Sequence, residues 1–160
     1  MRVVSNTSPI SNLAIIDRLE LLRARYGTLL IPTAVESELS ALSHPLAKQR
    51  IQSAISAGWI VMKPNPATRF PLLLDPGEIA AIALAQSEKA DILLIDEKRG
   101  RAAARALGIK VAGVLGELIF AKRVASISSV KSEIHRLRTD ARFFIDPAVE
   151  HFILSEVGEA

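Results

Sequence analysis

The stretch ILLIDE, residues 92–97, is the most strand-like part of this 160-residue chain. Four branched apolar residues, Ile92–Ile95, stand together and are followed at once by the acidic pair Asp96 and Glu97. A short apolar run of this kind is typical of a strand that is buried on both faces of a parallel sheet. Ligands of such sheets gather beyond the carboxyl ends of the strands, so Asp96 stands where a functional residue is expected.

Helices are predicted before and after this strand in the sequence. The stretch DPGE, residues 75–78, opens the preceding helix, because it has an aspartate for the N-cap, a proline for the first helical position and a glutamate that completes a capping box. The alanine-rich run Ile79–Gln86 continues that helix. On the other side, a helix is predicted over Arg99–Leu107 and ends at Gly108.

Further short apolar runs and helical patterns alternate along the chain. The other predicted strands are Arg2–Ser5, Thr28–Ile31, Trp59–Met62 and Lys110–Ala112, and the residues Asn6, Thr7, Ser8 and Pro9 are predicted as a turn. Helical spacing predicts a helix through Leu13, Ile16, Leu19 and Leu22 that ends near Gly27, then helices around Val35–Leu42, over Leu46–Ala57, over Val114–Arg123 and from Ser128 onward, apart from Phe143–Ile145. Pro64, Pro66 and Pro71 predict a loop.

This alternation predicts an α/β fold, a three-layer sandwich with a central parallel sheet of four to five strands. We expect a single domain over residues 1–160, with a core of about 1–125 and a helical C-terminal extension of about 126–160.

Composition narrows the classes of protein further. Apolar residues make up 49% and charged residues 23%, which suits a packed core. The absence of cysteine excludes disulfides, thiolate metal sites and a cysteine nucleophile. No signal peptide or membrane span is expected, so a cytoplasmic location is predicted. The net charge of +3 permits contact with a polyanion, although each basic cluster also suits a solvated helix face.

Three carboxylates are candidates for chemistry, and each has a structural alternative. Asp96 can be a helix N-cap or a ligand at the sheet edge, and Glu97 can share either role. Glu38 falls on the apolar stripe of its helix and therefore needs a partner, which can be an arginine or a bound cation. The capping box alone can explain Glu78. Glu78 can also serve the site, because the first turn of a helix that flanks the sheet lies near the strand ends.

Other features are interpreted as structural. The glycines of residues 113–116 lack the pattern of a phosphate loop, and His44, His135 and His151 lack metal-ligand spacing. Trp59 and the phenylalanines form no base-stacking motif and are expected in the core.

Four motifs, taken in order, resemble the PIN domain, the fold of VapC-like toxin ribonucleases. They are Asn6-Thr7-Ser8, Val35-x-x-Glu38-Leu39, Gly77-Glu78-x-x-Ala81-Ile82-x-Leu84-Ala85 and Leu93-Leu94-Ile95-Asp96-Glu97. The resemblance covers about residues 1–125, and GVLGELIFAKR, residues 113–123, resembles a subfamily without an assigned function. The family typically has an aspartate where this chain has Asn6.

The resemblance implies a ribonuclease that depends on Mg²⁺ or Mn²⁺, which prefer oxygen ligands. It implies Glu38, Glu78 and Asp96 as catalytic metal ligands. It also implies lesser roles for Asn6 as a weaker neutral ligand, for Glu97 beside Asp96, for Ser8 as a supporting hydroxyl, and for Arg99 and Arg101 as contacts to the RNA backbone.

The resemblance also implies partners, and two other functions stay open. RNA, a cognate antitoxin and a second copy of the chain are the implied partners. Because Asn6 removes one charge, the chain can instead be a catalytically weak or inactive PIN protein that binds RNA or a protein. A third reading is an ordinary α/β domain whose carboxylates lie apart and serve only the fold.

Overall fold

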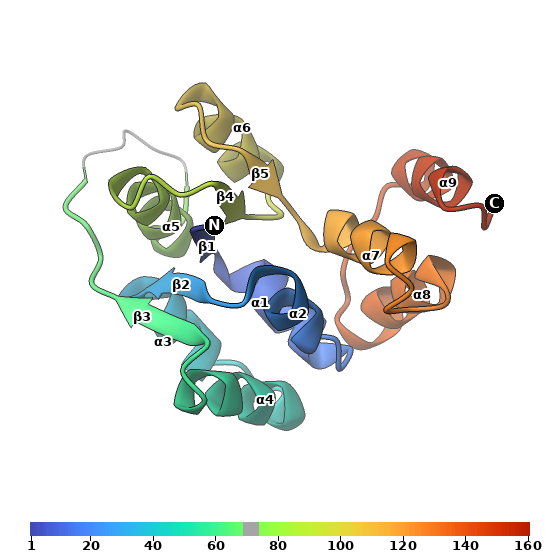
Figure 1. Ribbon diagram of the computed structural model, residues 1–160, viewed down its shortest axis with the longest axis horizontal. Helices are drawn as coiled ribbons and strands as arrows, with labels where there is room; N and C mark the ends of the chain where they lie inside the picture. Colours follow the sequence, from blue (N-terminus) through green and yellow to red (C-terminus); the bar gives the residue numbers. More distant parts are fainter. Residues whose placement is uncertain (69–73) are drawn as a thin grey trace.

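The computed structural model describes residues 1–68 and 74–160, which form an α/β fold around a five-stranded sheet (Figure 1). Its strands are β1 Val3–Ser5, β2 Leu29–Pro32, β3 Ile60–Lys63, β4 Ile92–Leu94 and β5 Val111–Ala112. They stand in the order β3-β2-β1-β4-β5, and every neighbouring pair is parallel. The predicted fold class, an α/β sandwich with a parallel sheet of four to five strands, is confirmed.

Helices connect the strands and flank the sheet. Their bounds are α1 Thr7–Ile15, α2 Glu20–Tyr26, α3 Thr33–Ser40, α4 Pro45–Ser56, α5 Pro76–Ser87, α6 Lys98–Ala106, α7 Val114–Arg123, α8 Val130–Asp140 and α9 Pro147–Glu156. The predicted strands and most predicted helices fall at these positions, with boundaries shifted by one or two residues.

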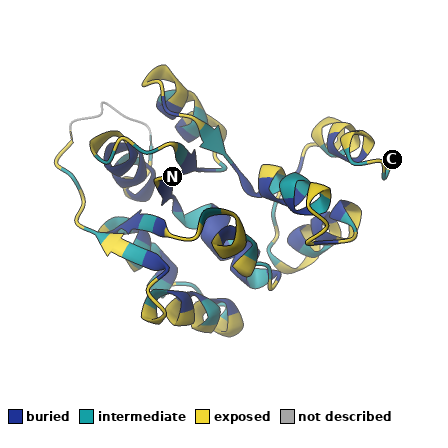
Figure 2. Cartoon of the chain, viewed as in Figure 1, coloured by how far each residue is buried: buried dark blue, intermediate teal, exposed yellow. Residues whose placement is uncertain are grey.

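The central strands lack the alternation of an exposed sheet because both of their faces are covered. All of β1 is buried, and Leu93, Leu94 and Ile95 at β4 are fully buried. Helix α5 packs along β1, β2 and β4, and its buried alanines let its backbone come close to the sheet. Figure 2 shows this buried layer running through the inner faces of the helices.

The predicted structure of residues 6–22 is wrong in two respects. The supposed turn after β1 is the start of α1, which begins at Thr7, because Pro9 is tolerated in the first turn of a helix. The single helix predicted through Leu22 is divided into α1 and α2, and Asp17 between them has a φ of 59°. Ile16 and Leu19 are buried in the connecting turn, so the apolar spacing continues where the helix does not.

The last three helices lie together beside the sheet (Figure 1). The guanidinium of Arg18 donates to Glu133 of α8 at 3.0 and 2.7 Å, and Arg25 of α2 pairs with Glu117 of α7 at 3.0 Å. Glu117 and Glu133 are both buried, so these ion pairs connect the C-terminal helices to the first two helices at defined points.

The expectation that the aromatic residues lie in the core is confirmed for Trp59 and is wrong for two phenylalanines. Trp59 is buried, whereas 83% of Phe144 and 63% of Phe152 is exposed, because nothing in the described chain covers them. Phe70 and Pro71 fall outside the described residues. No helix within residues 1–68 and 74–160 has the length and apolarity needed to cross a membrane.

Candidate functional site

The order in which strands are added to the sheet reverses at its centre, and the candidate residues follow the strands that meet there. Strand β1 pairs with β2 on one side and with β4 on the other, although β4 comes much later in the sequence. Ligands of parallel sheets bind beyond the strand ends at such a reversal. Asn6 follows β1 and its N–H donates to Leu94 O at 2.8 Å, and Asp96 lies two residues past the end of β4.

Asp96 is held by residues of α1 and α7 and does not cap the helix that follows it. The Ser8 hydroxyl donates to its Oδ2 at 2.6 Å, and the N–H of Val114 donates to its Oδ1 at 2.8 Å. The N-cap of α6 is Glu97, which is exposed and makes no capping hydrogen bond to the described residues. Burial raises the pKa of Asp96, although the bonds from Ser8 and Val114 oppose this change.

Glu38 lies at the same edge of the sheet, where it is bonded to Thr7, the first residue of α1. The hydroxyl of Thr7 donates a short hydrogen bond to Glu38 Oε2, and no ion pair with an arginine is found among the described residues. The carboxylate of Glu38 also packs against Gly77, because a Cβ on Gly77 would lie 2.7 Å from Oε2. Among the described residues, Glu38 is therefore bonded to a hydroxyl and not to an arginine, and Arg69 lies outside those residues.

Glu78 forms the predicted capping box and faces inward as well. Its N–H donates to Asp75 Oδ1 at 2.8 Å, and its Oε1 accepts from the N–H of Asp75 at 3.3 Å. Only 6% of Glu78 is exposed, and Oε2 lies where a Cβ on Gly100 would be 2.7 Å away. Burial, followed by hydrogen bonding with Asp75, raises the pKa of Glu78 to about 7.

Asn6 contributes a buried oxygen that the protein does not use. It is the N-cap residue of α1, yet within the described chain its side chain makes no capping hydrogen bond. In the described part of the chain, Asn6 Oδ1 and Glu78 Oε2 are the buried side-chain polar atoms that lack a hydrogen-bond partner. Because buried oxygens are normally satisfied, these two are available to accept from a bound water or to ligate a cation.

The basic and acidic residues around Asp96 differ in their exposure. Glu97 lies close enough to Glu78 and Asp96 for its negative charge to raise the pKa of both. Arg99 is exposed, as a contact to RNA requires. Arg101 turns inward instead, because its guanidinium donates to Ile95 O at 3.2 Å, and burial lowers its pKa.

A glycine lies against each of the three carboxylates, and sequence reasoning missed this pattern. Gly77 faces Glu38, Gly100 faces Glu78, and a Cβ on Gly113 would lie 2.6 Å from Asp96 Oδ1. The sequence signal was available, since these glycines occur in or directly before helices, where they otherwise destabilise. Each glycine leaves room for a carboxylate to approach the backbone.

The donor set fits a hard divalent cation in its chemistry. Asn6, Glu38, Glu78 and Asp96 offer only oxygen atoms, and two of those oxygens are buried and unsatisfied. Across residues 1–68 and 74–160, no three histidine, aspartate or glutamate side chains stand together as a ready-made metal site. The protein alone therefore holds its carboxylates apart with hydroxyl and backbone donors.

Comparison with known proteins identifies the family. The family model described as the PIN domain matches residues 2–159. The chain belongs to the PIN-domain family. PIN domains have a nuclease-type fold and generally use divalent metal ions. No curated protein matches this chain.

A solved structure has a similar fold. It is a PilT N-terminus domain protein from the hyperthermophilic archaeon Sulfolobus solfataricus, with a TM-score of 0.56 and 21% sequence identity. The match covers 76% of this chain and 93% of the archaeal chain. At this identity, the likeness concerns the fold of the PIN domain alone.

The first testable prediction concerns Gly77. Gly77→Ala is expected to weaken Mn²⁺ binding about tenfold, because the new methyl group displaces the carboxylate of Glu38. The fold should survive, since the end of a flexible side chain can move aside. Isothermal titration with Mn²⁺ measures the affinity, and a thermal melt in EDTA checks the fold.

Gly116→Ala is the matched control for this substitution. Gly116 lies in α7, and a Cβ there meets nothing within 4 Å. Alanine in that helix should stabilise the protein by up to about 1 kcal/mol and leave Mn²⁺ binding unchanged. Equal Mn²⁺ affinity for Gly77→Ala and wild type would show that Glu38 does not contribute to a metal site.

Proposed function

We propose that this chain is a metal-dependent endoribonuclease of the PIN type, acting as the toxin of a toxin–antitoxin pair. The observation that supports this best is the pair of buried, unsatisfied oxygens on Asn6 and Glu78, at the edge where Glu38 and Asp96 also lie. Residues 1–160 would act as one unit, with the helices after about residue 126 as an extension of the PIN core.

The proposed ligands are Glu38, Glu78 and Asp96, with Asn6 as a neutral ligand and Glu97 as an outer carboxylate. A bound Mg²⁺ or Mn²⁺ supplies a water of lowered pKa and neutralises charge on the departing oxygen of the phosphodiester. Thr7 and Ser8 are adjacent residues that orient Glu38 and Asp96 by hydrogen bonds. They keep two carboxylates in place on either side of Asn6.

The basic residues beside the site have separate proposed roles. Arg99 is exposed at the start of α6 and would contact the RNA backbone. Arg101, which donates to Ile95 O, would instead partly offset the negative charge of Asp96. An antitoxin and a second copy of the chain are the proposed protein partners, and RNA is the proposed substrate.

Cleavage of single-stranded RNA with controlled metal tests the proposal. Wild type is expected to cleave a labelled RNA in Mg²⁺ or Mn²⁺ and to lose all cleavage in EDTA. The carboxylates alone can neither lower the pKa of a water nor neutralise the charge on the departing oxygen. Restoring Mn²⁺ after EDTA should recover the activity. Equal cleavage in EDTA and in Mn²⁺ would exclude the metal mechanism.

A second function is favoured by two observations, the neutral Asn6 and the separation of the carboxylates in the described chain. In this alternative the PIN domain binds RNA or a protein partner and cleaves RNA weakly or not at all. Metal binding without RNA turnover would support it.

Asn6→Asp distinguishes the two functions. The substitution should tighten Mn²⁺ binding at least about tenfold and raise cleavage, because one further charge comes within reach of a dication. In EDTA the same variant should be slightly less stable, because another carboxylate joins a buried acidic group. Thermal melts in EDTA and in excess Mn²⁺ measure both effects.

Asn12→Asp is the matched control, because it adds the same charge within α1, more than one helical turn after Asn6. Its side chain lines the hollow at Asp96 and donates to Ser8, so the control places a new charge near the site but not at the Asn6 position, and a smaller gain in Mn²⁺ affinity is expected. If Asn6→Asp gains no more stability from Mn²⁺ than wild type, Asn6 does not occupy a ligand position.

A further inference from the structure

An exposed aromatic side chain lines the same surface hollow as Asp96 of the candidate site. Phe144 belongs to the turn between α8 and α9 and is 83% exposed. It is the most exposed large apolar side chain in the described part of the chain, ahead of the terminal Met1 at 80%. A single exposed ring is common on protein surfaces, so what this ring can do depends on the residues around it.

Two surface hollows meet at this turn. The first has a volume of about 400 Å³ and is lined by Ser8, Asp96, Glu97, Lys98, Arg142 and Phe144, among others. The second has a volume of about 490 Å³ and extends from the same Arg142 and Phe144 toward Arg138. Because the hollows share these residues, they form a path that leads from Asp96 across the ring of Phe144.

The charges along this path suit a polyanion. Lys98 and Arg142 are exposed, and neither has an ion-pair partner among residues 1–68 and 74–160. Arg138 also lines the path, although it pairs with Glu150. Cationic side chains around one aromatic ring are the combination that proteins use to bind single-stranded nucleic acid.

Arg142 occupies a backbone conformation that glycine adopts more readily. Its φ is +53°, in the left-handed region, where it ends α8 and turns the chain toward Phe144. The N–H of Phe143 donates to Leu137 O at 3.0 Å and closes this turn. Glycine is the usual residue at such a helix end, so a glycine can replace Arg142 there without backbone strain.

We propose that Phe144 stacks on a base of single-stranded RNA whose neighbouring phosphates contact Arg142 and Lys98, next to the carboxylates of the candidate site. The C-terminal extension thereby forms one wall of the substrate path, and Phe144 selects for an unpaired base beside the scissile phosphate. The proposal rests on the proposed function in taking RNA as the ligand. A protein partner would suit the exposed ring but not the open, cationic path that leads to Asp96.

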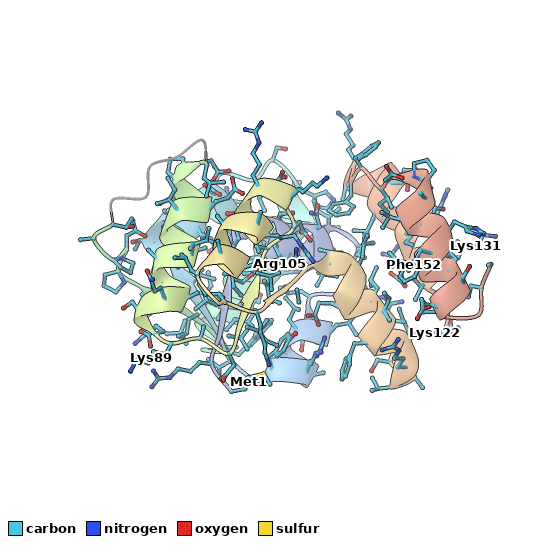
Figure 3. The ribbon with its side chains drawn as sticks, turned by 90° about the horizontal axis from the view of Figure 1, so that it is seen from above. Met1, Lys89, Arg105, Lys122, Lys131 and Phe152 are labelled. Carbon is cyan, nitrogen blue, oxygen red and sulfur yellow. The ribbon has the colours of Figure 1, made fainter. Side chains whose placement is uncertain are left out.

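Phe144→Ala and Phe152→Ala form the central comparison. Phe152 is 63% exposed on α9 and lines neither hollow, so it controls for the loss of an exposed ring (Figure 3). Binding of a fluorescent single-stranded RNA is measured in EDTA, where metal-dependent cleavage does not occur. Phe144→Ala is expected to lower the affinity about tenfold, and Phe152→Ala to leave it unchanged.

Two further arms separate stacking from apolar docking. Phe144→Leu keeps an apolar side chain and removes the ring, so it should bind RNA as weakly as Phe144→Ala. An abasic oligonucleotide with the same number of phosphates should bind wild type and Phe144→Ala equally. Normal RNA binding by Phe144→Leu, or sedimentation showing that Phe144→Ala changes only the oligomeric state, would overturn the proposal in favour of a protein partner.

Arg142→Gly and Lys89→Gly test the phosphate contact without harming the fold. Both residues are cationic and both have a positive φ, 53° and 51°, and Lys89 lies at the far end of the molecule from the C-terminal helices (Figure 3). Neither glycine variant should melt below wild type. Arg142→Gly should weaken the binding of both RNA and the abasic strand. It should also reduce the slope of log affinity against log salt concentration by about 1, whereas Lys89→Gly should change neither the affinities nor the slope.

The outcomes separate this proposal from the proposed function. RNA binding in EDTA that depends on Phe144, in a wild type that never cleaves RNA in Mn²⁺, would support the stacking role and exclude the nuclease. Cleavage by wild type with equal RNA binding by Phe144→Ala and wild type would support the nuclease and overturn the stacking role. Absence of RNA binding by wild type would also overturn the stacking role.

Discussion

Asp96→Asn is expected to lower metal-dependent RNA cleavage by at least about 100-fold. Loss of a residue that only orients a metal ligand typically costs 10- to 100-fold, so loss of a charged ligand should cost more. The asparagine keeps an oxygen that can accept from the N–H of Val114, so the fold should persist. Initial rates in Mn²⁺, measured together with a thermal melt in EDTA, show whether activity is lost without unfolding.

Asp91→Asn is the matched control for this experiment. Asp91 stands just before β4, at the opposite end of the strand that leads to Asp96, and accepts from the N–H of Arg2 at 2.6 Å. The control should cleave RNA like wild type. A purified Asp96→Asn variant that cleaves at the wild-type rate would remove Asp96 from the mechanism and point to a contaminating nuclease.

Wild type is expected to lose up to about 3 kcal/mol of stability between acidic and mildly alkaline pH through the titration of Glu78 beside Asp75. The pKa of Glu78 is about 7 in the folded protein and near 4.5 when unfolded, so the folded state holds the proton more tightly. Below about pH 4.5 both states are protonated, and the group has no effect. As pH rises through the window from about 4.5 to 7, the unfolded state ionises first and the free energy of unfolding falls.

Glu78→Gln removes this titration. Denaturant melts in EDTA at pH 5 and pH 8 should show a smaller loss of stability in the variant, with a difference between the two proteins of up to about 3 kcal/mol. Parallel pH profiles would show that Glu78 is not held in the buried environment described above.

Excess Mn²⁺ provides an independent arm of the same experiment. A bound dication favours the ionised carboxylate, so Mn²⁺ should remove the loss of wild-type stability at pH 8 and should stabilise Glu78→Gln less. Binding that strengthens as pH rises toward 7 would agree with release of the proton from Glu78.

The capping box and the orphan oxygen of Glu78 illustrate the limit of local sequence reasoning. The sequence alone predicted that Glu78 would bond to Asp75, because a capping box involves only residues three apart. It could not show that the second oxygen faces Gly100, a residue of the next helix. That contact depends on how α5 and α6 pack, which involves the whole sheet.

The aromatic residues give a second example. Phe143–Ile145 was correctly predicted to interrupt the C-terminal helices, since Asp146 and Pro147 begin a new helix. The exposure of Phe144 was not predicted, because an aromatic residue in a short turn is buried or exposed according to what else packs there. Only the placement of α8, and of the turn that follows it, beside α1 decided it.

The sequence by itself determined the alternation of strands and helices, the parallel sheet and the order of the four PIN-like motifs. These follow from short-range patterns: apolar runs, helical spacing and capping residues. The tertiary structure decided that Thr7 bonds to Glu38 and Ser8 to Asp96, that three glycines make room for the carboxylates, and that Phe144 stands open beside them. The two hydrogen bonds join residues 31 and 88 positions apart, and these separations are closed only when β1 pairs with β2 on one side and with β4 on the other.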